Sequence, residues 1–278
     1  MQEAAFRAVG RKAFYLPFEV RQGEFFRLLR NRRKLLLDGF NVTVPYKENV
    51  LRLLDRMSPR ARAIGAVNTV VRKGKQWIGY NTDETGFIAS LEKEGKFQAR
   101  GKRALILGAG GSARAVAHGL ARRGVRQITI ANRTVSRARK VINRFRRLFP
   151  NVEFVGARLP AGEAGLPRPG RGNNPAPTDK FYGGIDLVVN ATSIGLRRGE
   201  PALVNPSNFP KKTLFFDLIY NPSETAFLRS AKKSGHRTLN GLGMLLYQGA
   251  EAFRFWTGRR APIGVMRRAL EDGLHRGH

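Results

Sequence analysis

The chain has 278 residues and a formal net charge of +31, which comes from 51 Lys and Arg against 20 Asp and Glu. This length is enough for two domains that each bury a core of their own. The chain has no cysteine, which excludes disulfides and thiolate metal sites, and its four histidines lack the spacing of metal ligands, so we expect no metal.

The first hundred residues alternate predicted helices and strands. In chain order we predict a helix over Met1–Val9, a strand over Phe14–Val20, a helix over Gly23–Leu37, a strand over Gly39–Val44 and a helix over Lys47–Leu54 after Pro45. Residues 66–71 and 77–80 predict a hairpin with its turn at 72–75. Residues 85–94 predict a helix that leads into a second domain.

From Arg103 onward, short strands rich in Val, Ile, Leu and Phe alternate with helices or loops, which is typical of parallel strands covered on both faces. The predicted strands are 104–107, 127–130, 152–155, 185–190 and 213–218, and the predicted helices are 112–122, 135–148, 242–255 and 262–270. Residues 160–184 are rich in Pro, Gly and Asn and predict a long exposed loop.

We therefore predict an α/β fold of two domains. Residues 1–83 form an α/β substrate-binding domain, to which the C-terminal helices in 242–278 return. Residues 84–241 form a Rossmann-type, doubly wound parallel sheet. No apolar run approaches the roughly 18 residues of a membrane-spanning helix, and no secretory leader precedes the first helix, so we expect a cytoplasmic protein without a membrane partner.

A glycine turn joins the first strand of the second domain to its helix. Its residues are Gly108, Ala109, Gly110, Gly111, Ser112 and Ala113. Gly108 allows the tight turn, Gly110 lets a pyrophosphate approach the backbone, and Ala113 lets the helix pack closely on the strand. Such turns also occur without a ligand, but the strand before, the helix after and the end of the next strand together indicate a dinucleotide site.

The end of the next strand indicates which dinucleotide is bound. It reads Asn132, Arg133 and Thr134, with Arg137 one helical turn later. Sites for an unphosphorylated ribose usually place Asp or Glu here, and that carboxylate would repel a 2′-phosphate. A guanidinium binds the phosphate with two charge-assisted hydrogen bonds. The sequence therefore predicts NADP(H) as the cofactor.

The high positive charge has two interpretations. Residues 101–150 contain no Asp or Glu, which is consistent with either a nucleic-acid surface or a solvated basic face on a protein that binds small anions. The helix 135–148 places Val141, Ile142, Phe145 and Leu148 on one face and basic residues over the rest, as a packing helix does. We expect no specific nucleic-acid partner, only non-specific polyanion binding at low salt.

Four further blocks place polar side chains where a strand ends or a helix begins. They are 41–47 (Asn-Val-Thr-Val-Pro-Tyr-Lys), 65–69 (Gly-Ala-Val-Asn-Thr), 81–83 (Asn-Thr-Asp) and 240–248 (Asn-Gly-Leu-Gly-Met-Leu-Leu-Tyr-Gln). Such positions line crevices at the carboxyl ends of strands in α/β folds. Their hydroxyl, amide, ammonium and carboxylate groups suit a small polyhydroxylated ligand.

These blocks resemble the shikimate dehydrogenase family. The resemblance also covers the glycine turn, residues 132–134, Asn190-Ala191-Thr192-Ser193 and 217–222 (Asp-Leu-Ile-Tyr-Asn-Pro), and runs from Met1 to about Leu270. It implies an oxidoreductase that acts on a CH–OH group and reversibly reduces 3-dehydroshikimate to shikimate with NADPH, in the biosynthesis of chorismate and the aromatic amino acids. It also implies that Lys47 and Asp83 are the catalytic pair.

The chemistry agrees with these two residue types. Hydride transfer to a ketone leaves negative charge on the oxygen, which requires a donor already in place. Lys47 can hold and deliver a proton there, while Asp83 orients the ammonium and shares the proton transfer. The alternatives are that Lys47 is a surface lysine at a helix start and that Asp83 caps the following helix.

The resemblance implies further binding residues. Asn68 and Asp83, with Lys47, Thr43, Tyr220 and Gln248, would bind the substrate. Leu218 and Gly241 would lie against the nicotinamide end of the cofactor. The alternatives are that Gln248 faces solvent, that Tyr220 ends a strand before Pro222, and that Leu218 is an ordinary buried strand residue.

The start of the sequence departs from the family pattern. The family begins with a strand and a loop whose two serines hold the substrate carboxylate with the tyrosine that Tyr220 matches, whereas here Met1–Phe6 aligns with the helix that follows. Either the chain is part of a longer protein or another element fills the gap. Loss of the strand would expose backbone groups of its neighbours, so we expect this form to bind cofactor but to turn over shikimate poorly.

Other functions remain as alternatives. One is a quinate/shikimate-type dehydrogenase of the same family with another cofactor or substrate range. A second is a folate-linked methylene dehydrogenase, which the Asn-Val-Thr and Asn-Thr-Asp blocks do not favour. A third is a catalytically weakened paralogue with a polyanion-binding role. For the enzyme itself we expect a monomer or a homodimer.

Overall fold

The computed structural model describes residues 1–31, 34, 36–159 and 183–275. The chain divides into two compact units. Unit 1 consists of Met1–Gly86 and Leu246–His278, and unit 2 consists of Phe87–Leu245. Residues 160–182 of the predicted long loop lie outside the described residues.

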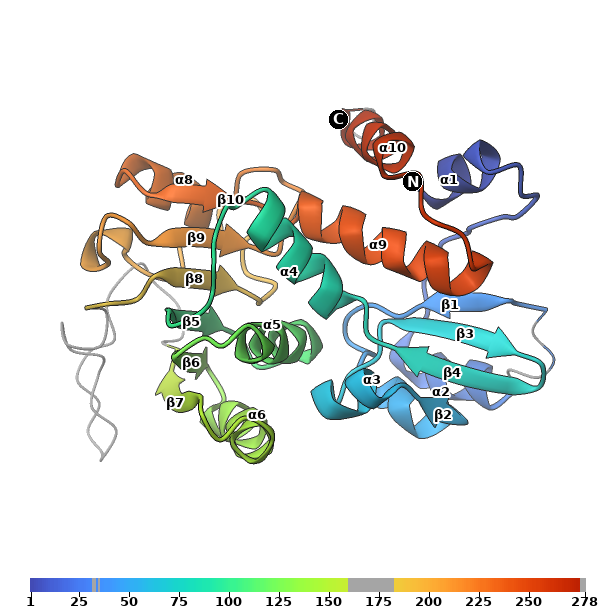
Figure 1. Ribbon diagram of the computed structural model, residues 1–278, viewed down its shortest axis with the longest axis horizontal. Helices are drawn as coiled ribbons and strands as arrows, with labels where there is room; N and C mark the ends of the chain where they lie inside the picture. The colour runs from blue at the N-terminus through green and yellow to red at the C-terminus, as the bar shows by residue number, and fades with distance from the viewer. Residues whose placement is uncertain (32–33, 35, 160–182, 276–278) are drawn as a thin grey trace. The chain divides into compact units, whose positions relative to one another are not determined.

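Unit 1 contains a four-stranded sheet with the strand order β1-β3-β4-β2 (Figure 1). Its strands are β1 (Gly39–Asn41), β2 (Arg56–Met57), β3 (Thr69–Lys73) and β4 (Gln76–Tyr80). β3 and β4 pair antiparallel, so the predicted hairpin is confirmed. Gly74 in its turn has φ of 58°, a left-handed conformation that glycine adopts without a steric penalty.

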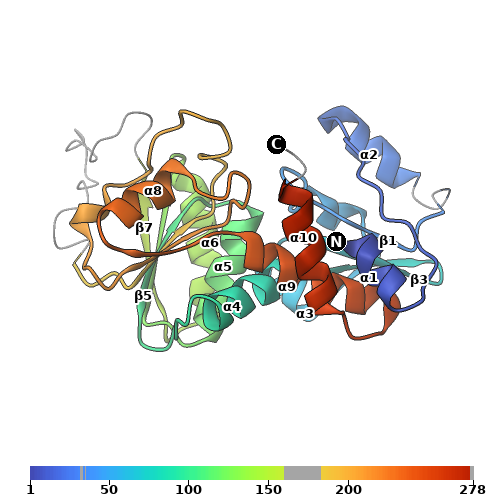
Figure 2. The same ribbon diagram turned by 90° about the horizontal axis from the view of Figure 1, so that it is seen from above.

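Helices cover unit 1. They are α1 (Gln2–Ala8), α2 (Gln22–Arg30), the 3₁₀ helix η2 (Asn49–Leu53), α3 (Pro59–Ile64) and α10 (Ile263–His275). The side chain of Ser58 caps α3, because its Oγ accepts the N–H of Ala61 at 3.1 Å. Figure 2 shows α1 beside α10, and one apolar cluster joins Phe6, Phe253 and Met266.

Several predictions for the first 54 residues were wrong or too long. Residues 14–20 form no strand, and Phe14 and Phe18 are 88% and 72% exposed. A strand requires a hydrogen-bonded neighbour, which a local apolar pattern cannot supply. The helix predicted to reach Leu37 ends at Arg30, the strand predicted to reach Val44 ends at Asn41, and the helix predicted over Lys47–Leu54 is the shorter 3₁₀ helix.

Unit 2 is built on six parallel strands in the order β10-β9-β8-β5-β6-β7, which confirms the doubly wound α/β prediction. The strands are β5 (Arg103–Leu107), β6 (Gln127–Asn132), β7 (Glu153–Arg158), β8 (Leu187–Asn190), β9 (Leu214–Asp217) and β10 (Arg237–Leu239). The strand order reverses between β5 and β8. Ligands bind in this type of sheet at such a reversal, beyond the carboxyl ends of the strands.

The helices of unit 2 are α5 (Gly111–Arg122), α6 (Val135–Leu148), α8 (Ala226–Lys233) and the 3₁₀ helix η3 (Pro206–Asn208). The chain passes between the units through α4 (Asp83–Lys93) and α9 (Leu242–Thr257). In Figure 1, α5 and α6 lie beside β5, β6 and β7. α6 has the predicted bounds and buries Val141, Ile142 and Phe145, whereas Leu148 is 46% exposed. Neither α8 nor β10 was predicted.

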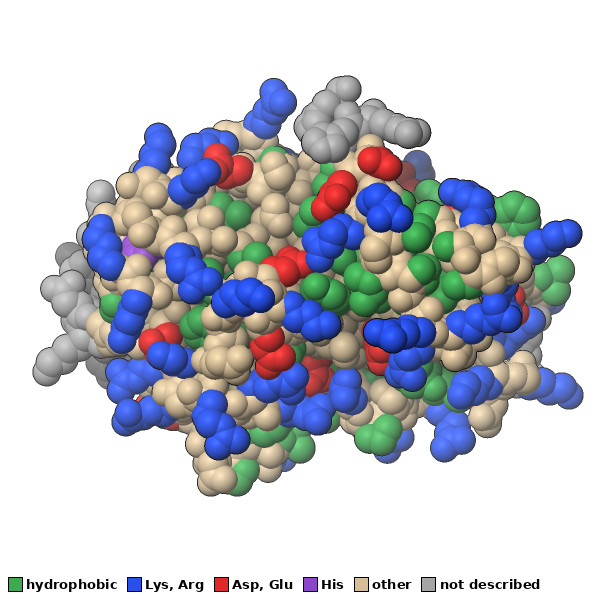
Figure 3. Space-filling view, turned by 45° about the horizontal axis from the view of Figure 1, so that its top comes forward, with side chains coloured by type: hydrophobic (Ala, Val, Ile, Leu, Met, Phe, Trp, Pro, Cys, Tyr) green, Lys and Arg blue, Asp and Glu red, His purple; other side chains and the backbone are tan. Residues whose placement is uncertain are grey.

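Basic side chains cover much of the surface. Figure 3 shows Lys and Arg spread over the face that it draws, with fewer acidic side chains among them. In α6 the exposed positions are mainly basic, as the sequence pattern predicts for a helix that packs by one face.

Within the described residues, no helix combines the length and the apolar character that crossing a membrane requires.

Candidate functional site

The first candidate site lies in unit 1, where the hairpin brings separate polar blocks together. Asn68 immediately precedes β3, and Thr82 and Asp83 follow β4. The two strands are antiparallel, with Thr69 opposite Tyr80, so the start of β3 and the end of β4 are neighbours. Backbone pairing therefore places Asn68 beside Thr82 and Asp83, all of which are buried.

Lys47 and Asp83 form an ion pair in this group. The Lys47 Nζ donates to Asp83 Oδ2 at 2.8 Å, and the two side chains are only 13% and 6% exposed. The Lys47 carbonyl accepts the N–H of Val67 at 2.8 Å, which holds the lysine segment against the residues before β3. Lys47 is therefore a shielded, paired ammonium rather than a free surface lysine.

Asp83 is held at both carboxylate oxygens. Its Oδ1 accepts from Asn68 Nδ2 at 2.8 Å, while its Oδ2 accepts from Lys47. The side chain that caps the start of α4 is Asn81, whose Oδ1 accepts the N–H of Glu84 at 3.2 Å. Asn81, and not Asp83, therefore caps this helix. The Asp83 carboxylate instead contacts the Lys47 ammonium and the Asn68 amide.

Asn68 connects this pair to α9. Its Nδ2 lies 2.8 Å from Asp83 Oδ1, 3.0 Å from Thr82 Oγ1 and 3.2 Å from Gln248 Oε1, and its Oδ1 accepts the N–H of Thr82 at 2.7 Å. Two N–H groups thus face three acceptors. We did not predict Thr82 as a site residue, although it lies inside the Asn-Thr-Asp block.

Thr43 and Tyr220 are the exposed members of the predicted substrate set. Thr43 is on an exposed turn in unit 1, where its carbonyl accepts the N–H of Tyr46 at 2.9 Å. Tyr220 is 38% exposed and belongs to unit 2.

The second candidate site is the glycine turn of unit 2. Gly108 has φ of 111°, and a Cβ there would lie 2.9 Å from the Ala191 carbonyl oxygen, so a side chain would be strained and crowded. At Gly110 a Cβ would meet nothing within 4 Å, so the space outside the turn is open. Helix α5 begins at Gly111 and directs its first N–H groups into that space. The turn therefore fits a pyrophosphate.

The end of β6 lies at the same edge of the sheet. Leu107 and Ala131 are in register, and the N–H of Gly108 donates to the Ala131 carbonyl at 2.7 Å. Asn132 closes the loop after β6, because its Nδ2 donates to the Thr134 carbonyl at 2.8 Å. Arg133, Thr134 and Arg137 are exposed. This loop offers two guanidinium groups and no carboxylate, which suits the binding of a 2′-phosphate.

A buried polar network holds the loops after β8 and β9. Asp217 is fully buried and accepts three hydrogen bonds, from Asn190 Nδ2 at 3.0 Å, from the N–H of Ile219 at 3.0 Å and from Thr225 Oγ1 at 2.6 Å. Burial raises the pKa of Asp217, and the three donors oppose that shift. The sequence blocks contained Asn190 and Asp217, but a polar residue at the end of an apolar strand was the only signal of this role.

The same network positions Leu218 and Gly241. The N–H of Leu218 donates to the Asn190 carbonyl at 3.0 Å, and the N–H of Gly241 donates to the Ile219 carbonyl at 3.0 Å. A Cβ on Gly241 would lie 2.1 Å from the Leu218 carbonyl oxygen, so only glycine permits this approach. The two residues therefore lie together beyond the carboxyl ends of the central strands.

We expect the Asp217→Ala variant to lower the free energy of unfolding of unit 2 by about 3 kcal/mol, because it leaves three buried donors without an acceptor. Urea unfolding followed by circular dichroism measures this change. Tryptophan fluorescence would not report on unit 2, because both tryptophans, Trp77 and Trp256, lie in unit 1. Asp217→Asn keeps one acceptor oxygen and the volume and is expected to lose about 1 kcal/mol. An unchanged unfolding midpoint for the alanine variant would contradict the assignment.

Three family models match the chain. The substrate-binding domain of shikimate dehydrogenase matches residues 1–70, the shikimate/quinate 5-dehydrogenase model matches residues 90–155, and the C-terminal domain of shikimate 5′-dehydrogenase matches residues 241–271.

Individual relatives match over nearly the whole chain. A protein of Moorella thermoacetica named shikimate dehydrogenase (NADP(+)) is 43% identical over 281 residues, which cover 99% of this chain and 88% of that protein. A crystal structure of a shikimate dehydrogenase in complex with NADP+ is 36% identical, with a TM-score of 0.83 and coverage of 98% and 89% of the two chains.

A quinate dehydrogenase from Corynebacterium glutamicum, solved in complex with NAD, is 31% identical, with a TM-score of 0.81 and coverage of 98% and 92% of the two chains. The identity and the coverage of these relatives show which family the chain belongs to. They confirm the resemblance inferred from the motifs. The chain belongs to the shikimate dehydrogenase family of oxidoreductases.

Proposed function

We propose that the chain catalyses the reversible, NADP-dependent interconversion of 3-dehydroshikimate and shikimate, a step of chorismate and aromatic amino-acid biosynthesis. The observation that carries the proposal is the buried group of Lys47, Asp83 and Asn68, which combines an ammonium, a carboxylate and an amide within hydrogen-bond distance. The shikimate dehydrogenase (NADP(+)) relative at 43% identity supports it. We also propose a cytoplasmic location, in keeping with a biosynthetic reaction.

In this proposal unit 2 holds the cofactor. The turn over Gly108–Ala113 binds the pyrophosphate, and the 132–137 loop binds the 2′-phosphate mainly through Arg133 and Arg137. Leu218 and Gly241 would contact the nicotinamide. When bound there, NADPH would supply the hydride for the carbonyl carbon of the substrate, and NADP+ would accept it in the reverse direction. The crystallised relative in complex with NADP+ supports this choice.

Lys47 moves the proton. Its ammonium donates a hydrogen bond to the substrate carbonyl oxygen and gives up a proton as negative charge develops on that oxygen. In the reverse direction the neutral amine takes the proton from the substrate hydroxyl. Asp83 keeps the Lys47 Nζ in place through Oδ2 and shares the transfer. Proton transfer by a positioned group of this kind contributes roughly 10²- to 10⁴-fold in rate.

Unit 1 holds the ring hydroxyls of the substrate. Asn68, Asp83 and Gln248 supply donors and acceptors from three segments, and a substrate hydroxyl can replace one of the hydrogen bonds that Asn68 Nδ2 makes. Thr43 and Tyr220 complete the proposed substrate set by resemblance to the family.

A second candidate is a quinate-type dehydrogenase that uses NAD, which the Corynebacterium glutamicum relative supports. Initial rates with shikimate and with quinate, each with NADP+ and with NAD+, separate the two. We expect the highest kcat/KM with shikimate and NADP+, because the 132–137 loop offers guanidinium groups and no carboxylate. A higher kcat/KM with quinate and NAD+ would favour the second candidate.

A further inference from the structure

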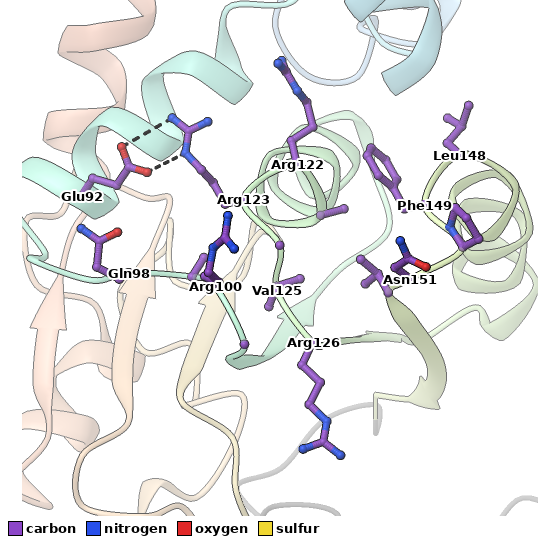
Figure 4. Close-up of a pocket in the computed structure, with 16 residues that line it drawn as sticks. Glu92, Gln98, Arg100, Arg122, Arg123, Val125, Arg126, Leu148, Phe149 and Asn151 are labelled. Carbon is purple, nitrogen blue, oxygen red and sulfur yellow. Dashed lines mark hydrogen bonds and ion pairs between the residues drawn. The ribbon is translucent and has the colours of Figure 1, made fainter.

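Unit 2 contains a cavity that neither the cofactor nor the substrate assignment uses. It has a volume of about 900 Å³ and lies at the amino ends of β5, β6 and β7 (Figure 4). Its walls come from the segments that precede these strands, residues 98–101, 121–126 and 148–152, and from Glu92 of α4.

The cavity is remote from the proposed cofactor residues. Gly108 and Asn132 lie at the carboxyl ends of β5 and β6, whereas the cavity lies at the opposite ends of the same strands. A strand of five residues such as β5 spans roughly 16 Å at about 3.3 Å per residue. A ligand in the cavity would therefore not compete directly with one bound on the glycine turn.

The charged side chains around the cavity are mainly positive. They are Arg100, Arg122, Arg123 and Arg126, with Glu92 as the acidic member. Figure 4 shows Arg123 directed at Glu92, and its Nε donates to Glu92 Oε1 at 2.6 Å. The other three arginines spread around the turn at Val125. The lining thus has three positive charges in excess, which favours a ligand with several negative charges.

Helix stabilisation explains only some of these arginines. Cations at the C-terminus of a helix interact favourably with its carbonyl end, and α5 ends at Arg122, next to Arg123. Arg100 and Arg126 belong to no helix, since they lie in the connections that lead into β5 and β6. Stabilisation of a helix end therefore does not account for these two arginines.

The floor of the cavity is apolar. Ala99, Ala121, Val125 and Val152 are each no more than 9% exposed, and the half-buried ring of Phe149 lies on one side. The nearby backbone is already paired: the N–H of Gly101 donates to the Gly124 carbonyl and the N–H of Arg126 to the Lys102 carbonyl, both at 2.8 Å. An anion here would be bound by guanidinium groups, and an apolar part of the ligand would cover the floor.

We propose that this cavity binds a nucleoside polyphosphate, with its phosphates on the arginine rim and its base on the apolar floor. Guanidinium groups bind phosphate oxygens with paired, charge-assisted hydrogen bonds. The volume lies within the roughly 300–1,000 Å³ of small-molecule sites, and an apolar lining with a few charged groups is typical of them.

The test is calorimetric titration of ATP into the full chain saturated with NADP+, at low salt. We expect one ATP site per chain, tripolyphosphate to bind more weakly than ATP, and the double variant Arg100→Gln/Arg126→Gln to weaken ATP binding about tenfold or more. The matched control is Lys212→Gln/Lys233→Gln, which removes two exposed positive charges elsewhere in unit 2 and is expected to change the affinity little. Neither double variant is expected to change the turnover of shikimate.

Several results would overturn the proposal. One is equal loss of affinity in both double variants, which would indicate a general charge effect. Others are absence of ATP binding once the NADP+ site is filled, and tripolyphosphate binding as tightly as ATP. Binding of single-stranded RNA that depends on Arg100 and Arg126, with no binding of ATP, would assign the surface to nucleic acid instead.

Discussion

The Lys47→Met variant is expected to lower kcat for shikimate oxidation by about 10³-fold while leaving the Kd for NADP+ unchanged. The variant keeps a side chain of similar length but removes the ammonium that pairs with Asp83 at 2.8 Å and carries the proton. Because the proposed cofactor residues all lie in unit 2, cofactor binding should not respond to a change at Lys47. Initial rates followed by NADPH absorbance, together with NADP+ titration, measure both quantities.

The control is Lys75→Met, on the exposed hairpin turn of the same unit, which is expected to retain the wild-type rate. Asp83→Asn keeps the shape of the side chain but cannot hold the ammonium by charge, and is expected to lose about 10²-fold in kcat. A loss below tenfold in Lys47→Met would exclude Lys47 as the proton donor.

Arg133→Asp is expected to raise the KM for NADP+ about 100-fold and to change the KM for NAD+ by about threefold or less. The substitution removes a guanidinium at the end of β6 and places a carboxylate where the 2′-phosphate is proposed to lie. Each charge-assisted hydrogen bond to a phosphate contributes about 1.5–3 kcal/mol, and the new carboxylate adds repulsion for NADP+ alone. Steady-state kinetics with both cofactors at saturating shikimate measures the change.

Arg139→Asp makes the same charge change at an exposed position of α6 outside the proposed cofactor set, and is expected to leave the preference for NADP+ intact. If both variants lost NADP+ affinity equally, the effect would come from the overall positive potential rather than from a contact of Arg133. Equal loss for NADP+ and NAD+ in Arg133→Asp would also contradict the 2′-phosphate assignment.

The parallel sheet of unit 2 was predictable because its signals are local. Strands such as β5 and β9 are apolar on both faces, and each predicted strand recurs within a few residues of its predicted bounds. Gly108 and Gly110 mark the turn by steric rules that depend only on the backbone of a few residues. Helix α6 recurs with the predicted bounds because its apolar positions follow the helical period.

The parts that were missed depend on distant partners. Residues 14–20 have a strand-like sequence but form no strand, since strand formation requires a neighbouring backbone. Asn68 reaches Gln248 across 180 residues of chain, which no local pattern reveals. The Asp217 network likewise depends on Asn190 and Thr225, which precede and follow it in the chain. The sequence alone placed these residues in polar blocks without specifying which ones pair.

Product analysis of one reaction tests the central proposal most directly. The full chain is incubated with shikimate and NADP+ and the mixture is followed by proton NMR. The proposed function predicts 3-dehydroshikimate and NADPH in equal amounts, formed by the wild-type chain and suppressed in Lys47→Met. Unchanged shikimate at saturating NADP+, with turnover of quinate and NAD+ by the same preparation, would contradict it.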